Sequence, residues 1–146
     1  MPVIKRKDEF DWEGVPVLAY KEDGTHFKSI TRRILFKGAD ELPSEVRYFE
    51  IAPGGHSTLE RHEHLHVVII QRGRGEILLG NQIHEVNPFD VIEIPSNTWH
   101  QFRATRNEPF GFLCIVNINR DRPHRPDTSE AENLKKDPEI STFIRL

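Results

Sequence analysis

The feature that most constrains the fold of this chain is a series of nine short apolar runs, each too short for a typical helix. The runs are rich in Val, Ile and Phe, and clusters of Gly, Pro and Asn separate them, as in Pro53-Gly54-Gly55 and Gly80-Asn81. Many short strands at regular spacing indicate an all-β antiparallel sandwich or barrel. The expected strands are Val15–Tyr20, Ile30–Phe36, Val46–Ala52, His66–Gln71, Glu76–Leu79, Gln82–Val86, Val91–Ile94, Trp99–Ala104 and Phe110–Ile118.

Both ends of the chain differ in character from this series. The first ten residues are expected to be flexible or to act as an arm. After an extended, proline-broken connection at Asp121–Pro126, Ser129 and Glu132 form a capping-box pattern that predicts a short helix through about Lys136. Asp137-Pro138 predicts a second short helix ending near Ile144.

Size and charge exclude several classes of protein. A chain of 146 residues suggests one domain. Its 20 Lys+Arg against 23 Asp+Glu leave no excess of positive charge that could bind the phosphates of a nucleic acid. The single Cys excludes an internal disulfide framework and is compatible with a reducing cytosol. The start turns acidic where a signal peptide needs an apolar core, and no apolar run approaches the roughly 18 residues that span a bilayer. A cytoplasmic protein with no nucleic-acid or membrane partner is expected.

Four of the 8 histidines fall within eleven residues, at His56, His62, His64 and His66. In one straight strand Glu60 and the last three would share a face, but strand rise would separate His62 from His66 by roughly 13 Å. Ligand nitrogens lie about 2 Å from a metal ion, so binding of one ion by both requires a bend at Glu63–Leu65. His64 would sit on that bend and point away. A solvated polar strand is the alternative.

A second stretch, Asp90–Phe102, favours metal binding, because the two stretches together resemble the motifs of the cupin family. In the first motif, Gly54 and Gly73 stand at the end glycines, with Glu60, His62 and His66 at the polar positions. In the second motif, Pro95 and His100 match. Phe89, Asn97 and Ala104 stand where Gly, Gly and Asn are usual, and Asn97 is tolerable because Asn enters left-handed backbone conformations readily.

The resemblance implies a double-stranded β-helix, or jelly-roll barrel, with one divalent transition metal at its mouth, held by Glu60, His62, His66 and His100. Relative to the family pattern, a carboxylate replaces the first His and a His replaces the usual carboxylate. Glu60 could instead accept a hydrogen bond from a ligand His. The mixed nitrogen and oxygen donors suit Fe, Mn, Ni, Cu or Zn and leave the identity of the metal open.

Strand alternation predicts the wall of the pocket beside this metal. With His66 and His100 inward, Val68, Ile70 and Phe102 also face inward. The resemblance places Phe112 and Cys114 near the metal. The set expected to line a substrate pocket is therefore Val68, Ile70, Phe102, Phe112 and Cys114. On the strand at Val46–Ala52, Arg47, Phe49 and Ile51 share a face opposite Tyr48, which is expected to face outward or toward a partner sheet.

Three functions fit these residues. The first is a metal-dependent oxygenase or oxidoreductase acting on a small organic molecule, with a cupin lyase or isomerase as a variant. The second is a non-enzymatic module that binds or senses a metal or small ligand, and the third is a structural or storage barrel. The whole chain, 1–146, is expected to be one cupin domain with a barrel core at about 28–118 and a tail at 119–146. The resemblance also implies a homodimer, in which Val15–Phe36 either pairs between barrels or covers its own.

Overall fold

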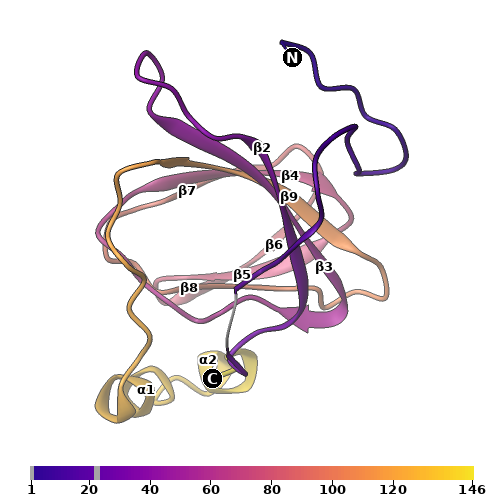
Figure 1. The fold of residues 1–146 in the computed structure, drawn as a ribbon. Coiled ribbons are helices and arrows are strands. Elements are labelled where there is room, and N and C mark those ends of the chain that lie inside the picture. Colours follow the sequence, from indigo (N-terminus) through magenta and orange to yellow (C-terminus); the bar gives the residue numbers. More distant parts are fainter. Residues whose placement is uncertain (1, 22–23) are drawn as a thin grey trace.

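The computed structural model describes residues 2–21 and 24–146, which form a curled antiparallel sheet followed by two short helices (Figure 1). The strands are β1 (Leu18–Ala19), β2 (Lys28–Phe36), β3 (Ser44–His56), β4 (His66–Arg72), β5 (Gly75–Leu79), β6 (Gln82–Val86), β7 (Val91–Ile94), β8 (His100–Arg103) and β9 (Phe110–Asn117). The helices are α1 (Thr128–Leu134) and α2 (Pro138–Phe143). Neither described helix has the length and apolar character needed to cross a membrane.

The strand order is β6-β5-β8-β3-β9-β4-β7, and β2 pairs with β3 on one side and β1 on the other. Strands distant in the sequence thus become neighbours, as when β9 lies between β3 and β4. This is the expected jelly-roll architecture, with α1 and α2 outside the barrel near one end (Figure 1). Within the chain, β1 and β2 extend the sheet of their own barrel, and pairing between barrels stays a prediction.

The barrel interior is apolar, as the alternation of the strands predicts. Val68 and Ile70 on β4 are fully buried, and Phe102, Phe110 and Phe112 pack together from β8 and β9. Phe49 faces the same interior from β3 and stacks on Phe112, with ring centroids 5.7 Å apart. The cavity at the histidines borders this apolar cluster, since Phe49, Phe102 and Phe112 line both.

Tyr48 alternates to the outer face, as expected, yet none of its surface is exposed. The N-terminal arm covers it: the ring of Phe10 stacks on Tyr48 at 5.3 Å and Trp12 meets it edge-on at the same centroid distance. An ion pair of 2.7 Å between Asp11 and Arg33 of β2 fixes the same segment. The arm therefore packs on the outside of its own sheet.

The tail follows the predicted plan with one correction. Helix α2 begins after Asp137, whose side chain accepts from the backbone N–H groups of Glu139 and Ile140, as expected. The capping box of α1, however, is formed by Asp127 and Glu130, two residues before the predicted pair Ser129 and Glu132. The two possible capping boxes overlap in this stretch, because each needs a polar residue followed by Glu three positions later. An Asp at the cap also suits the positive end of the helix dipole.

The end of the tail is tied to β8 through a buried amide. The side chain of Gln101, fully buried, donates to the carbonyls of Ser57 and Arg145 at 2.9 and 2.8 Å, and its oxygen accepts from the N–H of Arg145 at 2.9 Å. Because side chains alternate along a strand, Gln101 points away from the side that His100 faces. The tail thus packs on the face of β8 opposite to His100 and stabilises the strand there.

Candidate metal centre

The bend required for metal binding is present. The chain leaves β3 at His56 and bends at Glu63 and His64, and β4 begins at His66, so His62 and His66 do not lie along one strand. Before the bend, the backbones of Glu60 and His100 exchange two hydrogen bonds of 3.2 and 3.0 Å. This pairing brings the second motif against the first.

The structure groups three of the four predicted ligands. His62, His66 and His100 each offer a ring nitrogen, and these nitrogens lie within 4.8 Å of one another. All three residues are buried, and their ring centroids are 4.9 to 5.1 Å apart. Small side-chain rotations would place the three nitrogens at the roughly 2.1 Å from one ion that imidazole ligands adopt.

Contacts of the Nδ1 atoms determine which ring nitrogen of each histidine faces the other two histidines. Nδ1 of His62 donates to the carbonyl of His64 at 2.7 Å, and Nδ1 of His100 donates to that of Thr98 at 2.9 Å. A carbonyl only accepts, so Nε2 of both rings carries a free lone pair. Nδ1 of His66 lies 3.1 Å from the sulfur of Cys114, while its buried Nε2 has no hydrogen-bond partner. Three lone pairs that protein groups leave unfilled suit a metal ion.

Burial keeps these imidazoles neutral. It lowers the pKa of His62 to about 4 and that of His66 to about 2, and the neighbouring His100 adds to both effects. Burial lowers the pKa of His100 as well. A metal competes with protons for the same lone pairs, so a lowered pKa favours metal binding at neutral pH.

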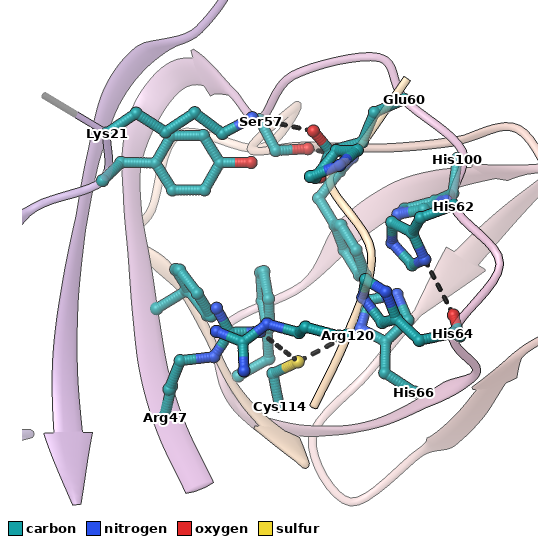
Figure 2. A pocket seen from close by; sticks show the side chains of 15 residues that line it. Lys21, Arg47, Ser57, Glu60, His62, His64, His66, His100, Cys114 and Arg120 are labelled. Atoms are coloured by element: carbon teal, nitrogen blue, oxygen red, sulfur yellow. Dashed lines mark hydrogen bonds and ion pairs between the residues drawn. The ribbon is translucent and has the colours of Figure 1, made fainter. Parts of the chain in front are cut away.

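Glu60, the fourth predicted ligand, lies beside the histidines and lines the same cavity. Its carboxylate forms an ion pair of 2.7 Å with Lys21 (Figure 2). Lys21 also donates to the hydroxyl of Thr58 at 3.1 Å. Metal ligation by Glu60 remains a prediction, and in this structure its partner is Lys21.

His64 sits on the bend as expected, but the expectation that it points away is wrong. Its ring stacks on that of His62, with centroids 3.7 Å apart and planes 2° from parallel. Its Nδ1 lies 2.7 Å from the carboxylate of Asp121 in the tail connection. The bend therefore turns His64 back along the ring of His62.

The histidines open onto a cavity of about 120 Å³ (Figure 2). Of the residues predicted to line a pocket, Phe102, Phe112 and Cys114 do so, together with Phe49. Val68 and Ile70 instead lie in the closed core, deeper along β4 than His66. Both belong to the core cluster, and neither lines the cavity.

Basic side chains line the cavity too, and the sequence motifs did not single them out. Figure 2 shows Lys21 and Arg47 entering from the side opposite the histidines, and Arg120 also contributes to the wall. Arg47 shares a strand face with Phe49, so alternation along β3 was a usable signal for it. Lys21 and Arg120 come from connections outside the two motifs and could not be found that way.

Comparison with known proteins agrees with the architecture. The family model described as Cupin domain matches residues 47–116. The chain is 47% identical over 139 residues to 1-methylthio-D-xylulose 5-phosphate methylsulfurylase of Rhodospirillum rubrum, covering 94% of this chain and 88% of that protein. A cupin 2 conserved barrel domain protein from Rhodopseudomonas palustris superposes with a TM-score of 0.94 at 44% identity, covering 99% of both chains. A 5-nitrosalicylic acid 1,2-dioxygenase from Bradyrhizobium is 33% identical over 55 residues, 38% of this chain and 27% of that protein.

Proposed function

The chain belongs to the cupin family, and from this membership we propose that it is a metal-dependent enzyme acting on a small phosphorylated organic substrate. The observation that carries the proposal is the unpartnered, buried Nε2 of His66, which faces the lone pairs of His62 and His100 at the edge of a cavity. A buried polar atom without a partner is costly unless a ligand completes it.

His62, His66 and His100 would hold the ion, and Glu60, on the wall of the same cavity, would either turn from Lys21 to join them or remain paired with it. A bound divalent ion such as Fe, Mn, Ni, Cu or Zn would supply Lewis acidity toward a substrate oxygen. The hydrogen bonds on Nδ1 of His62 and His100 hold the two rings in a fixed orientation. Phe49, Phe102 and Phe112 exclude water from the other wall of the cavity.

The similarity to the methylsulfurylase suggests the substrate class. We propose that this chain acts on the same kind of compound, a ketose phosphate that carries a methylthio group. In 1-methylthio-D-xylulose 5-phosphate the sulfur is attached to the carbon beside the ketone. When a thiolate of the acceptor attacks that sulfur, an S–S bond forms and the bond between sulfur and C1 breaks, so the methylthio group leaves as a mixed disulfide. The electron pair stays on C1 as an enolate, which takes up a proton at C1 to give the 1-deoxy sugar phosphate. The enolate carries its negative charge on the ketone oxygen, which is the charge that an electrophilic site stabilises best. The basic side chains of the cavity suit the phosphate.

The test is to incubate the purified protein, with its metal content measured, with 1-methylthio-D-xylulose 5-phosphate and dithiothreitol as sulfur acceptor. Proton NMR then follows the S-methyl signal. Loss of the carbon-bound methylthio group that stops after treatment with a chelator supports the proposal. Metal-loaded protein that leaves the compound unchanged contradicts it.

An oxygenase is the second candidate, favoured by the partial similarity to a dioxygenase and by the phenylalanine wall of the cavity. Oxygen uptake with small diketones, catechols and thiols tests it. Metal and ligand binding without turnover in either assay would instead favour a binding or sensing module. Rearrangement of the substrate without transfer of sulfur would indicate a lyase or isomerase.

We also propose that the barrel core at 28–118 and the tail at 119–146 fold as a single domain that forms a cytoplasmic homodimer. The contacts of Gln101 with Arg145 support a common folding unit. Sedimentation velocity measures the assembly, and a species of 17.0 kDa at micromolar concentration would contradict the dimer.

A further inference from the structure

The positive charge around the cavity is distributed unevenly. Lys21 is matched one to one by Glu60, with Nζ and Oε2 only 2.7 Å apart. Arg47 and Arg120 share a single carboxylate: Oε1 of Glu45 lies 3.3 Å from Nε of Arg47 and 3.5 Å from Nη2 of Arg120. Two guanidinium groups with one partner between them leave an unmatched positive charge at this side of the cavity.

Arg47 is held in place before any ligand arrives. Its guanidinium carbon lies 4.9 Å from the ring centroid of Phe49, and its Nη2 donates to the sulfur of Cys114 at 3.3 Å. Its Nε is buried and makes no hydrogen bond, since the contact with Glu45 lacks the alignment of one. The rigid fork of an arginine matches the oxygens of a phosphate, and immobilisation beforehand reduces the entropy lost on binding.

The spacing between Arg47 and the histidines suits a short phosphorylated chain. The sulfur of Cys114 lies 3.1 Å from Nδ1 of His66 and 3.3 Å from Nη2 of Arg47, so a single atom separates the ring from the guanidinium. A substrate oxygen at the histidines and an anionic group a few bonds away can therefore contact both ends of the cavity at once.

We propose that Arg47 and Arg120 form a phosphate subsite, called here the arginine pair, in which the shared carboxylate of Glu45 lies between the two guanidinium groups. The inference rests on the proposed function and deepens it: the keto end of the sugar phosphate lies at the histidines and the phosphate lies at the arginine pair. The arginine pair makes the cavity specific for phosphorylated substrates. Lys21, neutralised by Glu60, contributes little to phosphate binding.

The test measures binding rather than turnover. Isothermal titration of the full-length, metal-loaded protein compares D-xylulose 5-phosphate with D-xylulose, neither of which carries a methylthio group. Inorganic phosphate serves as a competitor. The variants are Arg120→Gln and Arg47→Gln, and the matched control is Arg122→Gln, an exposed arginine two residues from Arg120. Arg120 stands on the tail connection, so its variant is expected to fold even if loss of Arg47 disturbs the packing on Phe49.

Each arginine variant is expected to weaken binding of the phosphorylated sugar roughly 10- to 100-fold, the range for a lost charge-assisted contact, with unphosphorylated sugar changed less than about twofold. Arg122→Gln is expected to bind like the wild type. The inference is overturned if both variants keep wild-type affinity for the phosphate, if both sugars weaken equally, or if the wild type binds neither. Arginine-dependent binding without turnover of the methylthio compound would retain the subsite and reject the proposed reaction.

Discussion

The carboxylate of Asp121 holds the backbone bend at His64. It accepts from the N–H groups of Glu63 and His64 at 2.8 and 3.0 Å, and from Nδ1 of His64 at 2.7 Å. These hydrogen bonds keep the pKa of Asp121 far below its usual range. Through the stacking of His64 on His62, a residue of the tail connection therefore influences the orientation of a candidate metal ligand.

We predict that Asp121→Ala lowers metal affinity about tenfold, within the range found for residues that orient ligands. The bend loses its three hydrogen bonds while the three histidines remain. Titration with Co²⁺, followed by its visible absorption, measures the affinity. Asp40→Ala, at an exposed position, is the control. Wild-type metal affinity in Asp121→Ala would contradict the prediction, because the bend would then keep its shape without these hydrogen bonds.

Replacing the histidines individually tests the centre itself. His62→Ala, His66→Ala and His100→Ala are each expected to lose most of the metal retained on purification, because two nitrogens bind an ion far more weakly than three. Metal analysis by mass spectrometry measures it. The exposed His84→Ala should keep the wild-type content. Full metal content in either His62→Ala or His100→Ala would contradict the assignment.

The lowered pKa values predict how the stability of the metal-free protein depends on pH. An unfolded histidine gains a proton below pH 6.5, whereas folded His62 and His66 stay neutral down to about 4 and 2. The unfolded state then binds more protons, so the free energy of unfolding is greatest above pH 6.5 and falls as the pH is lowered. For each such histidine, the free energy of unfolding falls by at most about 1.4 kcal/mol per pH unit.

Thermal unfolding of chelator-treated protein at pH 7, 6 and 5 measures this dependence. His66→Gln should flatten the decline, since the variant no longer buries an imidazole there. A melting temperature of the wild type that stays constant across this range would contradict the prediction.

Cys114 is expected to orient His66. Cys114→Val removes the group that contacts Nδ1 and should weaken metal binding about tenfold, while Cys114→Ser, which keeps an acceptor, should remain near the wild type. Competition with a chelator of known affinity measures the difference. Equal losses in the two variants would point to packing rather than to the hydrogen bond.

The N-terminal arm offers a prediction about stability alone. Trp12→Ala removes one of the two rings that cover Tyr48 and should lower the free energy of unfolding by about 2 kcal/mol. Chemical denaturation measures it. Metal content should not change, because the arm packs on the outer face of the sheet.

Most of the fold could be predicted from local patterns, since strand length, alternation and turn residues act over a few residues. The backbone at Asn97 shows where this works, and the backbone at Phe89 shows an exception. Both residues adopt positive φ, 55° and 74°, at the positions where the family motif has glycine. Asn tolerates this conformation, whereas Phe89 is strained there, because its Cβ is crowded by its own backbone.

The parts of the site that could not be predicted come from contacts distant in the sequence. Nothing near Lys21 indicates that it would meet Glu60, and nothing near His64 indicates Asp121, 57 residues away. Those pairings depend on how the connection after β1 and the tail connection lie beside the histidine cavity. The capping box at Asp127 was missed for a different reason: adjacent polar residues offer several caps of similar free energy.

The contact between Gln101 and Arg145 has a practical consequence for anyone producing this protein. A chain shortened by its last two residues would leave the Gln101 side chain, next to His100 in the barrel wall, with the carbonyl of Ser57 as its remaining partner, and its buried oxygen would lose the N–H from which it accepts. Loss of metal in such a shortened chain would reflect damage to the wall rather than to the ligands. Affinity tags are therefore best placed beyond a spacer after Leu146, which is 50% exposed.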